Sequence, residues 1–208
     1  NSNTPARPRA EPCCRPLAGG RPQHGAARTG KVRPAPSAPR TNTVSAAPEH
    51  PLLCHPASRR PAAAAIGASA RLASDGSLIL RYDVRAPAHT LLLPAARPPG
   101  TADGLWRHTC CEAFVTTVDG PEYHEFNLSP AGEWAVYRFT AYRERDPVFQ
   151  PPAAPRIACV AAAGGFCLSA RIAGELLPPA AAYAVGLSAV IETPAGELSY
   201  WALAHAAG

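Results

Sequence analysis

Apolar and polar residues alternate one by one over short segments of this chain. Between residues 77 and 85 the even positions are Leu, Leu, Tyr and Val, whereas the odd positions include two Arg and one Asp. This period of two is typical of a β-strand that buries one of its faces. Asp75 and Gly76, immediately before this segment, form a dipeptide typical of a tight turn. We therefore expect a hairpin between segment 77–85 and the preceding segment 63–73.

Eight further short segments have a strand-like pattern. They are residues 89–93, 108–117, 122–128, 134–141, 157–162, 166–172, 184–191 and 199–203. Turns that contain Gly or Pro separate several of them, and Pro and Gly also interrupt the Ala-rich stretches that would otherwise favour helices. Short strands at this spacing are typical of an antiparallel β-sandwich of the jelly-roll kind. The sequence therefore predicts an all-β fold.

Charge divides the chain into two parts. Residues 1–50 contain eight Lys or Arg, two acidic residues, nine Pro and no Phe, Trp or Tyr, whereas residues 51–208 contain 12 Lys or Arg and 13 acidic residues. A segment with so few large apolar side chains cannot offset the entropy that it would lose on ordering. We therefore expect a disordered, Pro- and Arg-rich basic tail over residues 1–50 and one β-sandwich domain over residues 51–208. No Arg of the tail alternates with an aromatic residue that could stack on a base, so we expect no nucleic-acid partner.

The chain lacks the sequence features of an exported or membrane protein. No apolar run approaches the roughly 20 residues of a transmembrane helix, and the first residues lack the apolar core of a secretory signal. The seven Cys are an odd number at irregular spacing, which argues against a disulfide framework and favours reduced thiols. We therefore expect a cytoplasmic protein with no membrane partner.

One short segment contains residue types that bind zinc. His108, Cys110 and Cys111 stand close together, and imidazole and thiolate are common zinc ligands. On a strand, however, His108 and Cys110 share one face and Cys111 takes the other. No second Cys/His cluster supplies the remaining ligands. We expect neither a metal site nor a cofactor.

Aromatic and acidic residues concentrate in segment 105–143. It contains Trp106 and Trp134, two of the three Trp in the chain, and ends at Arg143. Aromatic faces beside carboxylates, an amide and Arg are suited to a polar, ring-shaped ligand. The segment contains no complete catalytic set, so we expect a binding module rather than an enzyme.

The expected strand 122–128 presents three polar or amphipathic residues on one face. Alternation places Tyr123, Glu125 and Asn127 together, opposite the apolar residues that enter the core. A ring, a carboxylate and an amide at this spacing form a platform for a sugar-like or polyol-like ligand. A solvated outer face would have the same pattern, and both interpretations stay open here.

Glu112 stands within CCEAFV, a segment whose other residues are suited to burial. Buried carboxylates are rare unless they are hydrogen-bonded or paired. A structural partner such as Arg138, Arg143 or a backbone N–H would account for this residue. A ligand accounts for it better once Trp106, six residues earlier, is considered too.

Three motifs carry a resemblance to a known family: LWRHTCCEAFV at 105–115, YHEFNLSPAGEWAVYRFTAYR at 123–143 and ELSYWALAH at 197–205. Their order is Trp, then Glu six residues later, then Tyr-x-Glu-Phe-Asn, and then Ser-Pro-x-Gly-x-Trp. On these motifs the chain resembles, from about residue 52 to residue 205, the bacterial DOMON-like proteins, which are related to family 9 carbohydrate-binding modules. The resemblance implies a β-sandwich that binds a ligand.

The better-known members of that family hold a terminal sugar between aromatic side chains, while polar side chains bond its hydroxyls. Carried over by position, the resemblance implies Trp106 as one stacking face, Trp201 as the second and Glu112 as a hydroxyl acceptor. A second implied group consists of Tyr123, Glu125, Asn127 and Trp134. Arg143 completes the expected ligand-binding set, because a guanidinium can donate to hydroxyls. The expected partner is a carbohydrate or a similar polyhydroxylated small molecule.

Three other functions stay open. Aromatic residues beside Arg are also typical of protein interfaces, so a protein-interaction or structural β-sandwich with a protein partner is the main alternative. DOMON relatives can hold haem, and because the chain has no Met, a bis-His or a His-Lys arrangement would remain, with ligands from His108, His124, His205 and Lys31 of the tail. Glu112 and Glu125 could form the carboxylate pair of a glycoside hydrolase.

Overall fold

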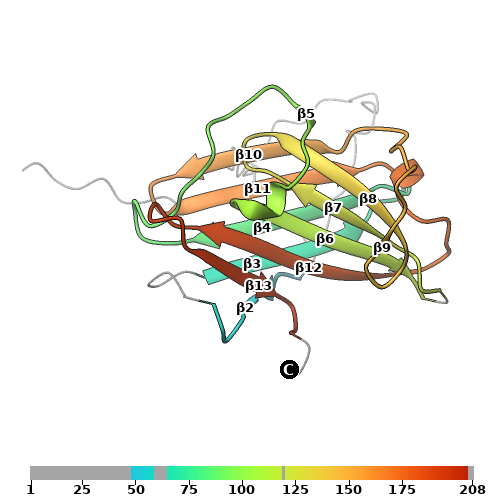
Figure 1. The fold of residues 1–208 in the computed structure, drawn as a ribbon, viewed down its shortest axis with the longest axis horizontal. Helices are drawn as coiled ribbons and strands as arrows, with labels where there is room; N and C mark the ends of the chain where they lie inside the picture. The colour runs from blue at the N-terminus through green and yellow to red at the C-terminus, as the bar shows by residue number, and fades with distance from the viewer. Residues whose placement is uncertain (1–47, 59–64, 119, 206–208) are drawn as a thin grey trace, which may run out of the picture.

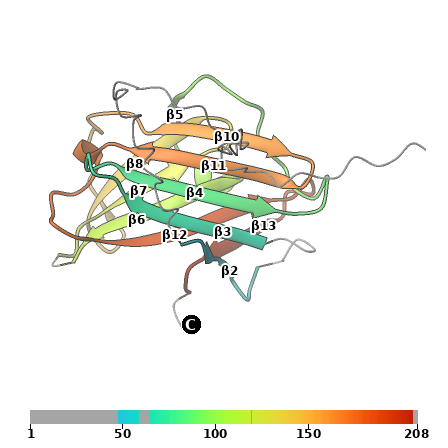
Figure 2. The same cartoon turned by 180° about the vertical axis from the view of Figure 1, so that it is seen from behind.

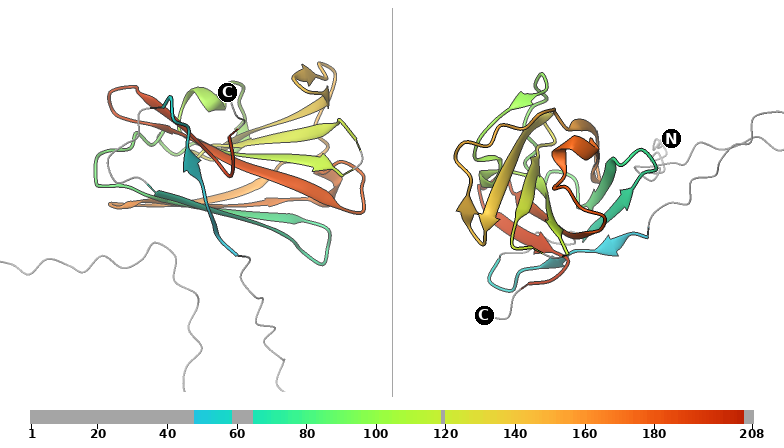
Figure 3. Two further views of the ribbon diagram at one scale, coloured as in Figure 1. Left: turned by 90° about the horizontal axis from the view of Figure 1, so that it is seen from below. Right: turned by 90° about the vertical axis from the view of Figure 1, so that its right-hand side faces the viewer.

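The computed structural model describes residues 48–58, 65–118 and 120–205. These residues form two packed sheets, as the edge-on view in Figure 3 shows. The expected all-β sandwich is therefore confirmed. The expected tail, residues 1–50, lies outside the described residues except for its last three. Since β1 (His50–Pro51) already pairs with a neighbouring strand, the boundary expected after residue 50 falls inside this element.

The two sheets differ in width. The five-stranded sheet, which faces the viewer in Figure 2, has the order β1, β3 (Ala65–Leu72), β4 (Leu78–Arg85), β11 (Gly165–Ile172), β10 (Arg156–Ala162). The eight-stranded sheet, which faces the viewer in Figure 1, has the order β2 (Leu53–Cys54), β13 (Leu198–Ala202), β12 (Tyr183–Glu192), β6 (Cys110–Thr117), β7 (Tyr123–Leu128), β8 (Glu133–Ala141), β5 (Gly100–Thr101), with β9 (Glu144–Arg145) paired to β8. Neighbouring strands are antiparallel except β5, which runs parallel to β8.

Among the described residues, the helical elements are two single turns of 3-10 helix, η1 (Leu105–Arg107) and η2 (Gly174–Leu176). Within the part of the chain that the structure describes, no helix combines the length and apolar character that crossing a bilayer would require.

The expected strands are present, with ends that differ by at most two residues, except for segment 89–93. The expected hairpin is formed by β3 and β4, in which Leu72 pairs with Leu78. Its turn contains Gly76 at φ +79°, and the Asp75 carboxylate accepts a hydrogen bond from the Ser77 N–H at 3.1 Å. A left-handed backbone at this position explains why the turn requires Gly.

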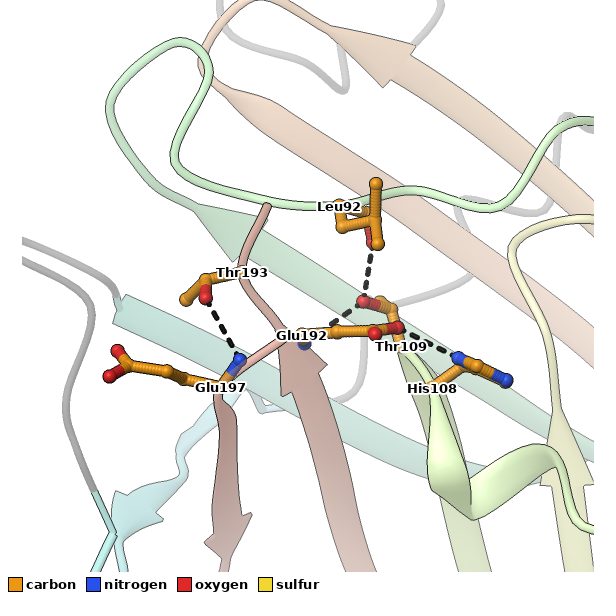
Figure 4. A network of polar contacts seen from close by, with 6 residues as sticks. All are labelled: Leu92, His108, Thr109, Glu192, Thr193 and Glu197. Atoms are coloured by element: carbon orange, nitrogen blue, oxygen red, sulfur yellow. Dashed lines mark hydrogen bonds and ion pairs between the residues drawn. The ribbon is translucent and has the colours of Figure 1, made fainter. Parts of the chain in front are cut away.

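Segment 89–93 is not a strand, so that prediction was wrong. Isolated hydrogen bonds hold it instead of a ladder: the Leu92 N–H donates to the Glu192 carbonyl at 2.8 Å, and Thr109 Oγ1 donates to the Leu92 carbonyl at 2.7 Å (Figure 4). The segment lies between two Pro residues, which cannot donate to a ladder. The two-residue strands were missed because they are too short to show a period.

The hydrophobic core lies between the two sheets. On β4 the alternating residues predicted to face inward are all buried: Leu78, Leu80, Tyr82 and Val84. The outer face of the eight-stranded sheet, which points away from this core, carries a second, smaller hydrophobic cluster: Leu105, Cys110, Ala135 and Tyr137. Helix η1 lies over this outer face (Figure 1) and so forms a raised wall beside an otherwise open sheet.

Candidate ligand-binding site

A pocket of about 400 Å³ opens on the outer face of the eight-stranded sheet. Its residues come from β6, β7, β8, β9, β12, β13 and η1, so it spans most of the width of the sheet. The lining residues, which we call the aromatic pocket, are Trp106, Glu112, Glu125, Tyr137, Phe139, Arg145, Val190 and Tyr200. Four aromatic rings thus surround two carboxylates, and the volume is within the range of small-molecule sites.

Strand register brings the floor of the aromatic pocket together. Glu112 lies opposite Asn127 on β7 and opposite Ser188 on β12, and Glu125 lies opposite Tyr137 on β8. Successive side chains of a strand point to opposite faces, so these residues share the outer face while their neighbours enter the core. Glu112 and Glu125 are diagonal neighbours across β6 and β7, and such residues are roughly 7 Å apart.

The Glu112 carboxyl is partly buried on this floor. Its Oε2 atom accepts a hydrogen bond from Ser188 Oγ at 2.6 Å. Burial disfavours the charged form and is the main cause that raises the pKa of Glu112 to about 7, while the Ser188 hydrogen bond opposes the shift and the Glu125 carboxylate adds to it. The partner is therefore a hydroxyl from β12, a neighbouring strand that is distant in sequence, rather than Arg138, which pairs with Asp146.

The three residues expected to form a platform on β7 share one face, but they have different surroundings. Glu125 lines the aromatic pocket, and burial raises the pKa of its carboxyl. Asn127 is fully buried beneath it and donates from Nδ2 to Glu125 Oε1 at 2.7 Å. Tyr123 stacks on Phe139 with ring centroids 4.5 Å apart, outside the pocket lining. Of this trio, therefore, only Glu125 lines the aromatic pocket.

Trp106 forms one wall of the aromatic pocket. It lies on η1 and keeps 38% of its surface exposed, whereas its neighbour Leu105 is buried. Its ring meets Tyr137 edge to face at 6.5 Å, and the Arg107 guanidinium lies 5.7 Å from its centroid. The indole is thus supported by other side chains while a large part of it stays free to contact a ligand.

Contacts among three side chains, Asp103, Tyr137 and Arg145, fix the rim of the pocket beside Trp106. The Tyr137 hydroxyl donates to Asp103 Oδ1, and this hydrogen bond is the main cause that lowers the pKa of Asp103. The Arg145 guanidinium lies 4.0 Å from the Tyr137 ring centroid, and its Nη1 atom is 3.8 Å from Asp103 Oδ1. These contacts hold Arg145, the positive charge in the pocket lining, at the rim rather than over the floor.

Besides Tyr123 and Asn127, three more of the expected ligand-binding residues are absent from the lining of the aromatic pocket. Trp134 and Trp201 are core residues with 8% and 3% of their surface exposed, and Trp201 Nε1 donates to Ser199 Oγ at 3.0 Å. Arg143 is exposed in the turn between β8 and β9, at φ +62°. The expected second stacking face, Trp201, is therefore a core residue, and its neighbour Tyr200 lines the pocket instead.

Sequence reasoning missed five residues of the lining. They are Tyr137, Phe139, Arg145, Val190 and Tyr200. Alternation along β8 could have shown that Tyr137 and Phe139 share the face opposite Trp134. Nothing local could have placed Val190 and Tyr200 there, because they reach Glu112 only through the pairing of β12 with β6 and β13.

The histidines considered as haem ligands lie in three separate environments. His108 Nδ1 is 2.9 Å from Glu192 Oε2 in the polar network of Figure 4. His124 is buried with its Nδ1 atom 2.7 Å from the Leu176 carbonyl, and His205 Nε2 is 2.8 Å from the Leu53 carbonyl. Across residues 48–58, 65–118 and 120–205, no three His, Cys, Asp or Glu side chains are grouped to hold a metal ion.

Comparison with known proteins gives structural similarities only. No protein-family model and no curated protein matches this chain. A family 9 carbohydrate-binding module from Caldicellulosiruptor kristjanssonii, solved with cellotriose, aligns with a TM-score of 0.49 and 11% identity over 76% of this chain and 72% of that one. The glucose complex of such a module from the same organism aligns at 0.47 and 9% identity over 68% of each chain. A protein from Bacteroides uniformis aligns at 0.49 and 12% identity over 75% of this chain and 77% of its own.

Proposed function

We propose that this protein is a carbohydrate-binding module that holds a saccharide in the aromatic pocket. The observation that carries the proposal is the pocket itself, in which aromatic rings surround two partly buried carboxylates on an open sheet face. Relation to the DOMON-like proteins stays a prediction.

The aromatic rings suit the apolar faces of a sugar. The CH groups of a pyranose stack on indole and phenol rings, and Trp106 and Tyr200 keep 38% and 47% of their surface exposed for such contact. Both belong to regular elements, η1 and β13, so little backbone entropy remains to be lost on binding. The apolar part of a saccharide ligand therefore has a prepared surface.

The polar groups of the pocket suit the hydroxyls of a sugar. Glu112 and Glu125 present carboxylate oxygens that accept hydrogen bonds, and Arg145 presents N–H groups that donate them. A ligand that left one of these carboxylates buried without a partner would lose roughly 1 to 3 kcal/mol. The pocket can therefore select among epimers although it is shallow.

The proposal is tested by titrating the full chain with a panel of mono- and oligosaccharides, followed by thermal shift and Trp fluorescence. Because Trp134 and Trp201 are buried, a ligand-dependent change of emission would come mainly from Trp106. We expect at least one saccharide to raise the melting temperature and change the emission. A flat response over the whole panel would overturn the proposal and favour the protein-interaction alternative.

A glycoside hydrolase is a second candidate, favoured by one observation. Glu112 has a pKa of about 7, which suits a general acid, and it lies near a second carboxylate. Both glutamates come from neighbouring strands of the floor, so they approach a ligand from the same side, whereas a hydrolase places them on both sides of the bond. Release of the aglycone from an aryl glycoside, lost in Glu112→Gln, would support this candidate over simple binding.

A further inference from the structure

The floor of the aromatic pocket holds two carboxylates whose hydrogen-bond partners are neutral. Glu112 accepts from the Ser188 hydroxyl and Glu125 accepts from the Asn127 amide. Among the residues that the structure describes, neither glutamate forms an ion pair. Two charged carboxylates this close repel each other and are costly to bury, so without a cation the floor favours protonation of Glu112, whereas a cation would favour the doubly charged pair.

Arg145 does not meet this requirement. It is held at the rim by Asp103 and by the ring of Tyr137. Its charge lowers the pKa of Glu125, but less than burial raises it, and it is not among the causes that shift Glu112. Among the described residues no cation therefore offsets both carboxylates, and a cationic ligand would supply that charge.

The walls of the pocket also favour a cation. Trp106, Tyr137 and Tyr200 present aromatic faces or edges around the two carboxylates, and aromatic faces attract ammonium groups. A protonated amine donates up to three hydrogen bonds and can reach two carboxylates at once. Hydrogen bonds between ions are shorter and stronger than those that a neutral hydroxyl makes to the same acceptor.

We propose that the aromatic pocket prefers a saccharide that carries a free, protonated amino group, with the ammonium on the Glu112 and Glu125 side of the floor. This inference rests on the proposed function and names the ligand class of the same site. The ring of the amino sugar stacks on the aromatic walls, while its ammonium group supplies a positive charge between the two glutamates.

The test compares sugars that differ in one substituent. Full-length protein is titrated at neutral pH with glucose, glucosamine and N-acetylglucosamine, and with the corresponding galactose series, by calorimetry. A charge-assisted hydrogen bond is stronger than a neutral one. We therefore expect the amino sugar of at least one series to bind about tenfold more tightly than both neutral sugars of that series. Ethanolamine, an amine without a ring, should bind far more weakly than the amino sugar.

Matched variants assign the preference to the floor. Glu112→Gln and Glu125→Gln keep the shape of each side chain and remove one charge, so each should reduce the preference for the amine to about twofold or less. Glu175, an exposed glutamate outside the pocket lining, supplies the control, and Glu175→Gln should keep the full preference. Two floor variants are used so that poor folding of one leaves the other informative.

The outcomes separate the two proposals. Equal or tighter binding of the neutral sugars would overturn the amine preference and leave the carbohydrate-binding proposal standing. A preference for the amine that survives in both floor variants would overturn the role of Glu112 and Glu125. If no sugar of either series or of the wider panel binds, the proposed function fails and this inference fails with it.

Discussion

At the scale of single residues, Glu112 determines the charge of the aromatic pocket. Its carboxyl lies among aromatic rings, beside a second carboxyl and against one hydroxyl. Burial and the Glu125 charge both favour its neutral form, and together they outweigh the Ser188 hydrogen bond. A residue in this state changes charge near neutral pH, which couples both stability and binding to pH.

Glu112→Gln should flatten the dependence of stability on pH. The ordinary pKa of this carboxyl is 4.5 and its folded pKa is about 7, so the folded protein binds the proton more tightly. The corresponding stabilisation is complete below pH 4.5 and is lost as the pH rises to about 7. The lost free energy of unfolding is roughly 3 kcal/mol. Urea unfolding across this window should show a larger loss in the wild-type protein than in the variant, which keeps only the contribution of Glu125, and parallel curves for the two proteins would contradict the shift.

Trp106→Ala should strongly weaken saccharide binding while the fold stays intact. The side chain is one wall of the pocket and is 38% exposed, so truncation removes ligand contact more than core packing. We expect affinity to fall at least tenfold and the free energy of unfolding to change by about 1 kcal/mol or less. Tyr142→Ala is the matched control, because Tyr142 is a 78% exposed aromatic residue outside the lining. Equal losses of affinity in both variants would show that the pocket is not the site.

At the scale of elements, the alternation along each strand decides which side chains serve the core and which serve the pocket. On β13 the two faces are one residue apart: Trp201 is 3% exposed in the core, and Tyr200 is 47% exposed at the pocket. The same division on β6 separates Glu112 from its buried neighbours. The pocket therefore depends on strands that keep their register, and a slip of one residue would exchange the two faces.

Gly165→Ala tests how tightly the register of β11 is held. Gly165 begins this strand at φ +130°, and a Cβ atom there would lie 1.8 Å from the Val84 carbonyl oxygen on β4. The clash is with backbone, so the strands must separate, and we expect the free energy of unfolding to fall by roughly 3 kcal/mol. The control is Gly164→Ala, at which a Cβ atom would meet nothing within 4 Å. Chemical denaturation should give a large loss for the first variant only, and similar values for both would contradict the argument.

At the scale of the whole molecule, the pocket floor is tied to the opposite sheet. The fully buried Tyr82 on β4 crosses the core and donates from its hydroxyl to the backbone carbonyl of Glu112 at 2.5 Å. This hydrogen bond joins the five-stranded sheet to the strand that carries the main carboxylate of the pocket. The sandwich therefore acts as the support that holds Glu112 in place.

Tyr82→Phe should lower stability without a change of packing volume. The variant keeps the ring and leaves the Glu112 carbonyl without this buried donor, so we expect a loss of about 1 to 2 kcal/mol in the free energy of unfolding. Tyr183→Phe is the control, because no hydrogen bond from the Tyr183 hydroxyl is found in the described parts of the chain. Thermal and urea unfolding of the two variants would measure the difference. A Tyr82→Phe protein as stable as the control would show that the bond contributes little.

The local pattern of the sequence determined the strands and the faces of most of them. Segment 77–85 was predicted correctly because a period of two and an Asp-Gly turn are properties of neighbouring residues. Trp106, Glu112 and Glu125 stand out for a similar reason, since they are unusual residue types within one short stretch, and all three line the aromatic pocket. Their role in binding stays a prediction. Segment 89–93 failed because its pattern resembles a strand, but its flanking Pro residues leave it without a ladder.

The tertiary structure alone decided which distant residues complete the pocket. Ser188 reaches Glu112 across 76 positions of sequence, and Tyr200 joins through the next strand, because β12 pairs with β6 on one side and with β13 on the other. Such pairing depends on the packing of the whole sandwich and leaves no trace in local periodicity. The assignment of Trp201 failed for the same physical reason: whether a strand residue faces the core or the ligand is decided by the sheet against which the strand packs.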